Sequence, residues 1–156
     1  MNLFTLLDEQ TVIPDLEVKN KEQVINALID TLSTKIDADS LKLVRESVFE
    51  RESVMSTGVG KGLAIPHCKT NGVNKNLAAF ARLSTPLDYD SIDEEPVGLV
   101  FLLISPEERN SLHIKLLSRI SRLMNSDSFR SKILACETKE MILAEFKEEE
   151  EKYFVS

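Results

Sequence analysis

An eight-residue run of almost entirely apolar residues, Val97 to Ile104, constrains the fold of this 156-residue chain more than any other segment. Unbroken apolarity over the length of one strand indicates burial on both faces of a sheet. Pro106 ends the run, and helices are expected to cover both faces. The run is far short of the ~20 residues that span a bilayer, so we expect no direct membrane insertion.

Two segments in the first third of the chain have the spacing of amphipathic helices. The first begins after Asn20, a favourable N-cap with Gln23 three positions on. The second runs from about Asp39 to Glu50, with Asp39 or Ser40 as its cap. Their apolar stripes consist of Val24, Ile25, Leu28 and Leu32, and of Leu41, Val44 and Val48.

Three further helices are expected after the apolar run. Ser111 is a suitable cap for the longest of them, whose stripe comprises Ile114, Leu117, Ile120, Leu123 and Met124. Shorter helices are expected over Asp127 to Ala135 and from Thr138 to about Phe146. The acidic run Glu148 to Glu151 then predicts a solvated tail from about residue 147.

Two more strands are expected, at Leu63 to Ile65 and at Leu77 to Leu83. The order of strands and helices predicts an α/β fold, with a central mixed β-sheet flanked by α-helices on both faces. No repeat, linker or change of composition divides the chain, so residues 1–156 are expected to form a single domain.

The net charge of −7 argues against binding to nucleic acid and to anionic membranes. Binding to nucleic acid requires Lys and Arg to displace counterions from phosphates, so no nucleic-acid partner is expected. A basic protein patch remains a suitable partner. The N-terminus lacks the basic region of a signal peptide, and Cys68 and Cys136 lack the spacing of a disulfide scaffold or zinc site, so a cytoplasmic protein is expected.

The chain has two histidines, His67 after a glycine-rich turn and His113 in the first turn of a helix. The usual histidine pKa of ~6.5 leaves a neutral, nucleophilic nitrogen abundant at cytoplasmic pH. Such a nitrogen accepts a phosphoryl group. The simpler interpretation is that His67 is a loop residue, that His113 packs at a helix start, and that Arg51 and Glu52 are solvated charges at a helix end.

A phosphoryl site needs donors for three charged oxygens. Ser56, Thr57, Gly58 and Gly60 offer hydroxyls and close backbone, and Arg51 offers a planar cation. The glycines of Gly58 to Gly62 match neither a nucleotide-binding loop nor a dinucleotide fingerprint, so no cofactor is expected. No ligand spacing supports a metal site, and no nucleophile elbow supports a serine hydrolase.

The string from Arg51 to His67, RESVMSTGVGKGLAIPH, resembles the active-site signature of the fructose/mannitol-type enzyme IIA domains of the bacterial sugar phosphotransferase system. The resemblance continues through Leu83 to Asp88, the apolar run and Leu112-His113. It implies that His67 accepts a phosphoryl group from the phosphocarrier HPr or a paralogue and passes it to a IIB component or other acceptor.

The resemblance also implies roles for five neighbours of His67. Arg51 and His113 correspond to an arginine and a second histidine that assist at the phosphoryl site, and Ser56, Thr57 and Gly58 to the phosphoryl-binding loop. The free-standing form favours a nitrogen-regulatory IIA over a fructose-type IIA, without excluding the latter.

Three hypotheses follow for function. The first is a phosphocarrier. The second is a regulatory module that binds a kinase, transporter or transcription factor according to the phosphorylation state of His67. The third, an α/β protein that has lost phosphotransfer, fits least well with Arg51, His67 and His113 together. The sugar, the acceptor, the oligomeric state and the phosphorylated nitrogen of His67 stay open.

Overall fold

Strand β6 (Val97–Pro106) lies at the centre of the sheet and is buried on both faces, as its apolar run predicts. The computed structural model describes residues 2–153. Alternate side chains of β6 enter different cores: Val100, Leu102 and Ile104 join one cluster, and Leu99, Phe101 and Leu103 join the other. This alternation is the period of two that a strand imposes on its side chains.

The sheet is mixed and has six strands in the order β1-β5-β6-β3-β2, with β4 also paired to β6. β5 (Leu77–Leu87) runs antiparallel to β6 and parallel to β1 (Val12–Leu16). The short strands β3 (Leu63–Ala64) and β4 (His67–Thr70) follow one another along the same edge of β6, both parallel to it. β2 (Gly58–Gly60) forms an antiparallel hairpin with β3.

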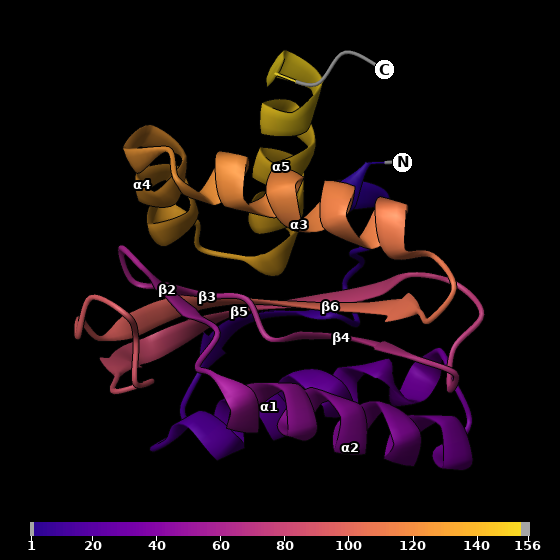
Figure 1. Cartoon of the computed structure of the whole chain (residues 1–156). Helices are drawn as coiled ribbons and strands as arrows, with labels where there is room; N and C mark the ends of the chain where they lie inside the picture. The colour runs from indigo at the N-terminus through magenta and orange to yellow at the C-terminus, as the bar shows by residue number, and fades with distance from the viewer. Residues whose placement is uncertain (1, 154–156) are drawn as a thin grey trace.

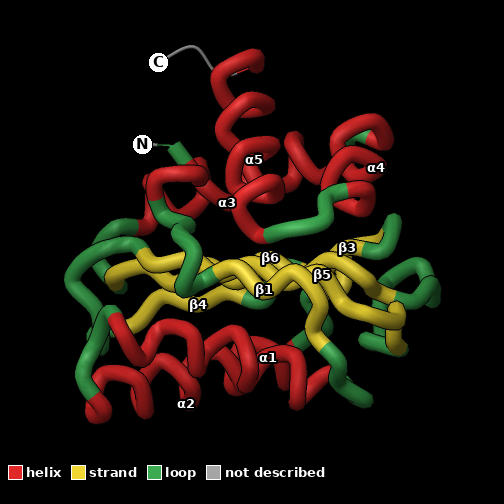
Figure 2. Tube along the Cα trace, turned by 180° about the vertical axis from the view of Figure 1, so that it is seen from behind, coloured by secondary structure: helices red, strands yellow, loops and turns green. Residues whose placement is uncertain are grey.

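Helices cover both faces of the sheet (Figures 1 and 2). α1 (Lys21–Asp30) and α2 (Ala38–Val54) lie on one face, and α3 (Asn110–Met124), α4 (Asp127–Ala135) and α5 (Lys139–Tyr153) on the other. The short 3-10 helices η1 (Leu3–Thr5) and η2 (Thr31–Thr34) complete the chain. The fold class expected from the sequence is confirmed. None of these helices within residues 2–153 is both long and apolar enough to cross a membrane.

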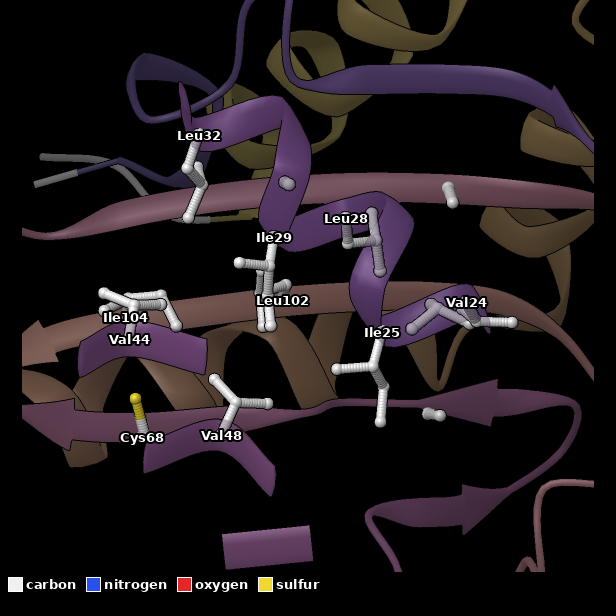
Figure 3. Close-up of a cluster of buried hydrophobic side chains, with 14 of the residues drawn as sticks. Val24, Ile25, Leu28, Ile29, Leu32, Val44, Val48, Cys68, Leu102 and Ile104 are labelled. Atoms are coloured by element: carbon white, nitrogen blue, oxygen red, sulfur yellow. The ribbon is translucent and has the colours of Figure 1, made fainter. Parts of the chain in front are cut away.

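The core between the sheet and α1–α2 contains the stripe predicted for the first helix. Figure 3 shows the α1 side chains Val24, Ile25, Leu28 and Ile29, with Leu32 of η2, in one cluster with Leu102 and Ile104 of β6. Asn20 caps α1 by accepting a hydrogen bond from the Gln23 amide, as expected. In α2 the cap is Asp37, which lies two residues before Asp39 and three before Ser40. The helix continues four residues beyond Glu50.

The start of α3 differs from the expectation. Its N-cap position is Arg109, which makes no side-chain capping bond, and Ser111 lies inside the first turn. Ile114, expected in the buried stripe, is 56% exposed. Ile120, Leu123 and Met124 are buried as expected, but in the first half of the helix the buried residues are His113, which turns inward to Ser105, and Leu116.

The prediction of a solvated acidic tail is wrong. α5 continues through the acidic run to Tyr153, and Glu149 and Glu150 are buried. Glu150 accepts hydrogen bonds from the amides of Leu3 and Phe4, at 2.7 and 2.6 Å, and lies 3.6 Å from the Arg119 guanidinium. These amides lie at the start of η1, where the helix itself offers no acceptor, and the buried carboxylate supplies one.

Strands β1, β2 and β4 were not expected from the sequence, and β5 is longer than the expected Leu77 to Leu83. The glycine-rich segment is the β2–β3 hairpin, with Lys61 and Gly62 in its turn at positive φ. The Lys61 amide donates to Asp93, which attaches the hairpin to the loop that follows β5. The hairpin and that loop form one wall beside His67.

Candidate functional site

His67 is the first residue of β4, which pairs only with β6 among the described strands. Its neighbour Cys68 joins the α1–α2 core, as Figure 3 shows, so the alternation of a strand turns His67 to the α3 side. The Nδ1 atom of His67 donates to the backbone oxygen of Ile65 at 2.7 Å. Since a carbonyl only accepts, the proton lies on Nδ1, and Nε2 keeps its lone pair.

His113 lies beside His67, as the sequence analysis predicted for a joint site. The two ring centroids are 5.6 Å apart and the ring planes are inclined at 48°. His113 is only 5% exposed, and its Nδ1 lies 2.7 Å from the hydroxyl oxygen of Ser105 on β6. Burial, followed by the neighbouring His67 ring and the Lys69 cation, lowers the pKa of His113 to about 4, so the ring is neutral at pH 7.

Arg51 lies in the last turn of α2 and completes the trio of site residues. Its Nη1 donates to the backbone oxygen of Met55 at 2.9 Å. The pKa of His67 is lowered, first by burial and also by the Arg51 cation. The hydrogen bond to Ile65 and the Glu52 carboxylate act in the opposite direction but do not outweigh this lowering. His67 is therefore also neutral at pH 7.

Two hollows meet at His67. The first, of about 600 Å³ and mainly apolar, is lined by Arg51, His67, Leu117, Ile92 and the Ser56–Val59 loop. The second, of about 490 Å³, lies toward the start of α3 and is lined by Lys69, Asn110 and His113 together with Arg51 and His67. A group attached to Nε2 of His67 therefore has space in these hollows, and the Arg51 side chain lines both of them.

The loop residues Ser56, Thr57 and Gly58 lie at the wall of the first hollow, but their donors already have partners. The Ser56 hydroxyl donates to the Tyr89 backbone oxygen and accepts from the Gly58 amide. The amide and hydroxyl of Thr57 both donate to Glu52. The structure thus brings all six predicted site residues into one region, and their roles in phosphoryl binding stay predictions.

Glu52 is a further residue of this region, for which the sequence indicated only a solvated charge at a helix end. It is 8% exposed and accepts from Thr57, from the Tyr89 hydroxyl at 3.0 Å and from Lys21 at 3.1 Å. A signal was present. Glu52 continues the four-residue spacing of Val44 and Val48, which places it on the buried face of α2.

The two cysteines do not add a reactive group to this site. Burial raises the pKa of the Cys68 thiol to about 12, so it stays protonated although it follows His67 in the chain. Within residues 2–153 no three His, Cys, Asp or Glu side chains are grouped as a metal site requires.

Comparisons with known proteins bear on the whole chain. Residues 5–149 match the family described as "Phosphoenolpyruvate-dependent sugar phosphotransferase system, EIIA 2". A nitrogen regulatory protein of Bradyrhizobium diazoefficiens is 36% identical over 135 residues, which cover 86% of this chain and 88% of that protein. The fructose-specific EIIABC component of Bacillus subtilis is 35% identical over 143 residues, 92% of this chain but only 22% of the longer protein.

The crystal structure of the nitrogen regulatory protein IIA-Ntr from Neisseria meningitidis superposes with a TM-score of 0.86 at 30% identity, covering 92% of this chain and 98% of that one. Fold, family match and sequence identity agree over nearly all of the chain. The chain therefore belongs to the EIIA 2 family of the phosphoenolpyruvate-dependent sugar phosphotransferase system.

Proposed function

We propose that His67 carries the phosphoryl group of this phosphotransferase component. It accepts the group from a phosphohistidine of HPr or an HPr-like carrier, and passes it to a IIB component or retains it as a regulatory signal. The observation that carries the proposal is the hydrogen bond from His67 Nδ1 to Ile65, which keeps a lone pair on Nε2 beside an open hollow. The residues 1–156 act as one unit in the cytoplasm, where the free thiols of Cys68 and Cys136 persist.

The transfer is an in-line exchange between two imidazoles. The Nε2–P bond forms as the donor P–N bond breaks, and the donor ring leaves as neutral imidazole when its other nitrogen carries a proton. Arg51 and His113, which line one hollow together with His67, stabilise the transferred charge. Ser56 and Gly58 exchange their mutual hydrogen bond for phosphoryl oxygens, and Thr57 acts by fixing the position of the loop.

The surface around His67 suits a protein partner. Val54, Met55, Val59 and Ile92 line the two hollows at His67 and are large apolar side chains that are all more than half exposed. The adjacent loop, residues 88–95, contains five carboxylates, and the whole chain has a net charge of −7. An apolar centre with an acidic rim fits a carrier protein that has a basic patch around its phosphohistidine.

The test is intact mass after incubation with phosphoenolpyruvate, enzyme I and HPr, with His67→Ala as control. We expect one acid-labile phosphoryl group on the wild type and none on the variant. Stoichiometric phosphorylation of His67→Ala overturns the assignment of His67, and an unmodified wild type with several carriers overturns the phosphocarrier role.

The same exposed apolar residues favour a second function, a regulatory module that contacts a kinase, transporter or transcription factor. Phosphorylation would place a dianion at the centre of that surface and weaken an apolar contact there. Affinity measured for a copurified partner should differ between phosphorylated and unphosphorylated protein. Equal affinities contradict the switch and leave the carrier role intact.

A further inference from the structure

Three hydrogen bonds connect the buried carboxylate of Glu52 to the ring of His67. The Thr57 amide donates to Glu52 Oε2 at 2.6 Å, and the Thr57 backbone oxygen accepts from the Ile65 amide at 2.9 Å. The Ile65 backbone oxygen in turn accepts from His67 Nδ1 at 2.7 Å. Each residue in this series is held by the one before it, from the end of α2 to the start of β4.

The first member of the series is firmly fixed. Glu52 accepts from four donors, the amide and hydroxyl of Thr57, the Tyr89 hydroxyl and the Lys21 ammonium. The Lys21 ammonium also lies 4.8 Å from the centroid of the Tyr89 ring. A carboxylate that is 8% exposed needs such compensation, and the compensation in turn holds the loop between α2 and β2 in one place.

We propose that Glu52 is a positioning residue for His67: through Thr57 and Ile65 it fixes the carbonyl that sets the tautomer and orientation of the reacting imidazole. The proposal rests on the phosphoryl-accepting role proposed for His67. Glu52 touches neither the ring nor the hollow into which the phosphoryl group is transferred. Its positional effect is transmitted by the backbone of two residues, and is distinct from the charge effect of its carboxylate on the ring.

The physical reason lies in what the Ile65 carbonyl does for the ring. A histidine held at Nδ1 by an acceptor presents an unprotonated Nε2, whereas an unheld ring rotates and exchanges its proton between both nitrogens. Removal of the Glu52 carboxylate leaves the buried Thr57 amide without its acceptor and leaves the Thr57 hydroxyl only the Tyr89 hydroxyl, 3.3 Å away, so the loop must shift to find another acceptor for the amide. A shift of about 1 Å at a reacting group costs on the order of 10²-fold in rate.

The experiment compares Glu52→Ala and Glu52→Gln with Glu150→Ala. Glu150 is the matched control, because it too is a buried carboxylate that accepts from backbone amides. It belongs to α5 and binds the amides of η1, away from His67. Two readouts need no protein partner: the ¹⁵N shifts of the His67 ring, which report its tautomer, and the rate of His67 phosphorylation by phosphoramidate, a small phosphoryl donor that releases ammonia.

We expect Glu52→Ala to populate both tautomers of His67 and to slow phosphorylation roughly 10- to 100-fold at a temperature where all variants are folded. Glu52→Gln should recover much of the rate, because its side-chain oxygen still accepts from the Thr57 amide. Glu150→Ala should lower the unfolding temperature with the wild-type rate and tautomer. A wild-type tautomer and rate in Glu52→Ala overturn the proposal.

Failure of the proposed function is distinguishable from failure of this inference. If neither HPr nor phosphoramidate modifies His67 in the wild type, the phosphocarrier role fails. The tautomer measurement still decides the role of Glu52 in that case: mixed tautomers in Glu52→Ala, with one tautomer in the wild type and in Glu150→Ala, support it, and a single Nδ1-protonated form in all three overturns it.

Discussion

The rings of His67 and His113 lie 5.6 Å apart between centroids, and each is held through its own Nδ1 atom. His67 Nδ1 donates to the Ile65 carbonyl, and His113 Nδ1 shares a hydrogen bond with the Ser105 hydroxyl. Nε2 is therefore the nitrogen that each ring has left for contact with a transferred group.

The first prediction concerns the phosphorylated atom. Because Nδ1 of His67 already carries a proton and donates it to Ile65, phosphorylation should occur on Nε2. Two-dimensional ¹H–¹⁵N spectra of the phosphorylated protein, with coupling to ³¹P, identify the substituted nitrogen. A phosphoryl group on Nδ1 would mean that the Ile65 hydrogen bond breaks during transfer, contrary to this prediction.

The second prediction concerns the pH dependence of stability. The folded-state pKa of His113 is about 4, below the usual ~6.5 of an unfolded chain, so between these values the unfolded state binds more protons. Stability from this residue is therefore fully present above pH ~6.5 and is lost as the pH falls toward 4. Between pH 7 and pH 5 the loss should be about 2 kcal/mol of unfolding free energy.

The control for this prediction is His113→Gln, which keeps a polar side chain but removes the titration. Urea unfolding at pH 7 and pH 5 should give a smaller difference for the variant than for the wild type. His67, whose pKa is also lowered, contributes in the same direction, so a residual slope is expected. An unchanged pH dependence in His113→Gln would exclude His113 as its source.

The apolar pattern was sufficient to predict the layers of the fold. The unbroken apolar run predicted β6, and apolar residues spaced three to four apart predicted α1; both elements lie where these patterns indicate. The edge strands β1 and β4 were not predictable in the same way. β4 is only four residues long, with the sequence His-Cys-Lys-Thr, which has no clear apolar pattern. Its pairing with β6 therefore decides its structure.

The third prediction tests a feature that sequence composition misrepresents. Four consecutive glutamates indicate solvent exposure, yet Glu150 is 0% exposed and binds the amides of Leu3 and Phe4, which a sequence pattern does not reveal because they lie at the other end of the chain. Glu150→Gln replaces one acceptor oxygen by a donor facing these amides. We expect a loss of roughly 1–3 kcal/mol in the free energy of unfolding.

Glu151→Gln is the matched control, since Glu151 is exposed on the same helix and carries the same charge. Chemical denaturation should place it within about 0.5 kcal/mol of the wild type. Equal effects of the two substitutions would indicate that charge alone matters and that the buried contact does not.

The site was predictable in part, for a similar reason. Arg51, His67 and His113 are residue types suited to phosphoryl transfer, so they could be selected from the sequence, and the structure places them together. Glu52 stands next to Arg51 in a charged stretch, and its burial depends on Lys21 and Tyr89, which are distant in sequence. Only helical phase relative to Val48 distinguishes it from its solvated neighbours.

The fourth prediction concerns the contact between the site loop and the loop after β5. A Cβ atom added at Gly58 would lie 2.9 Å from the backbone Cα of Ser91, and backbone cannot swing aside as a flexible side chain does. The Ile92 amide donates to the Gly58 oxygen at 3.1 Å, so the two segments are tied together at this point. Gly58→Ala should separate them, displace Thr57 and slow phosphorylation of His67 roughly tenfold or more.

Gly98→Ala on β6 is the control, because its Cβ would lie 3.5 Å from Pro86, which is an ordinary contact. Its phosphorylation rate should stay close to that of the wild type. A wild-type phosphorylation rate in folded Gly58→Ala would mean that the loop accommodates the methyl group without moving the hydrogen-bond series that reaches His67.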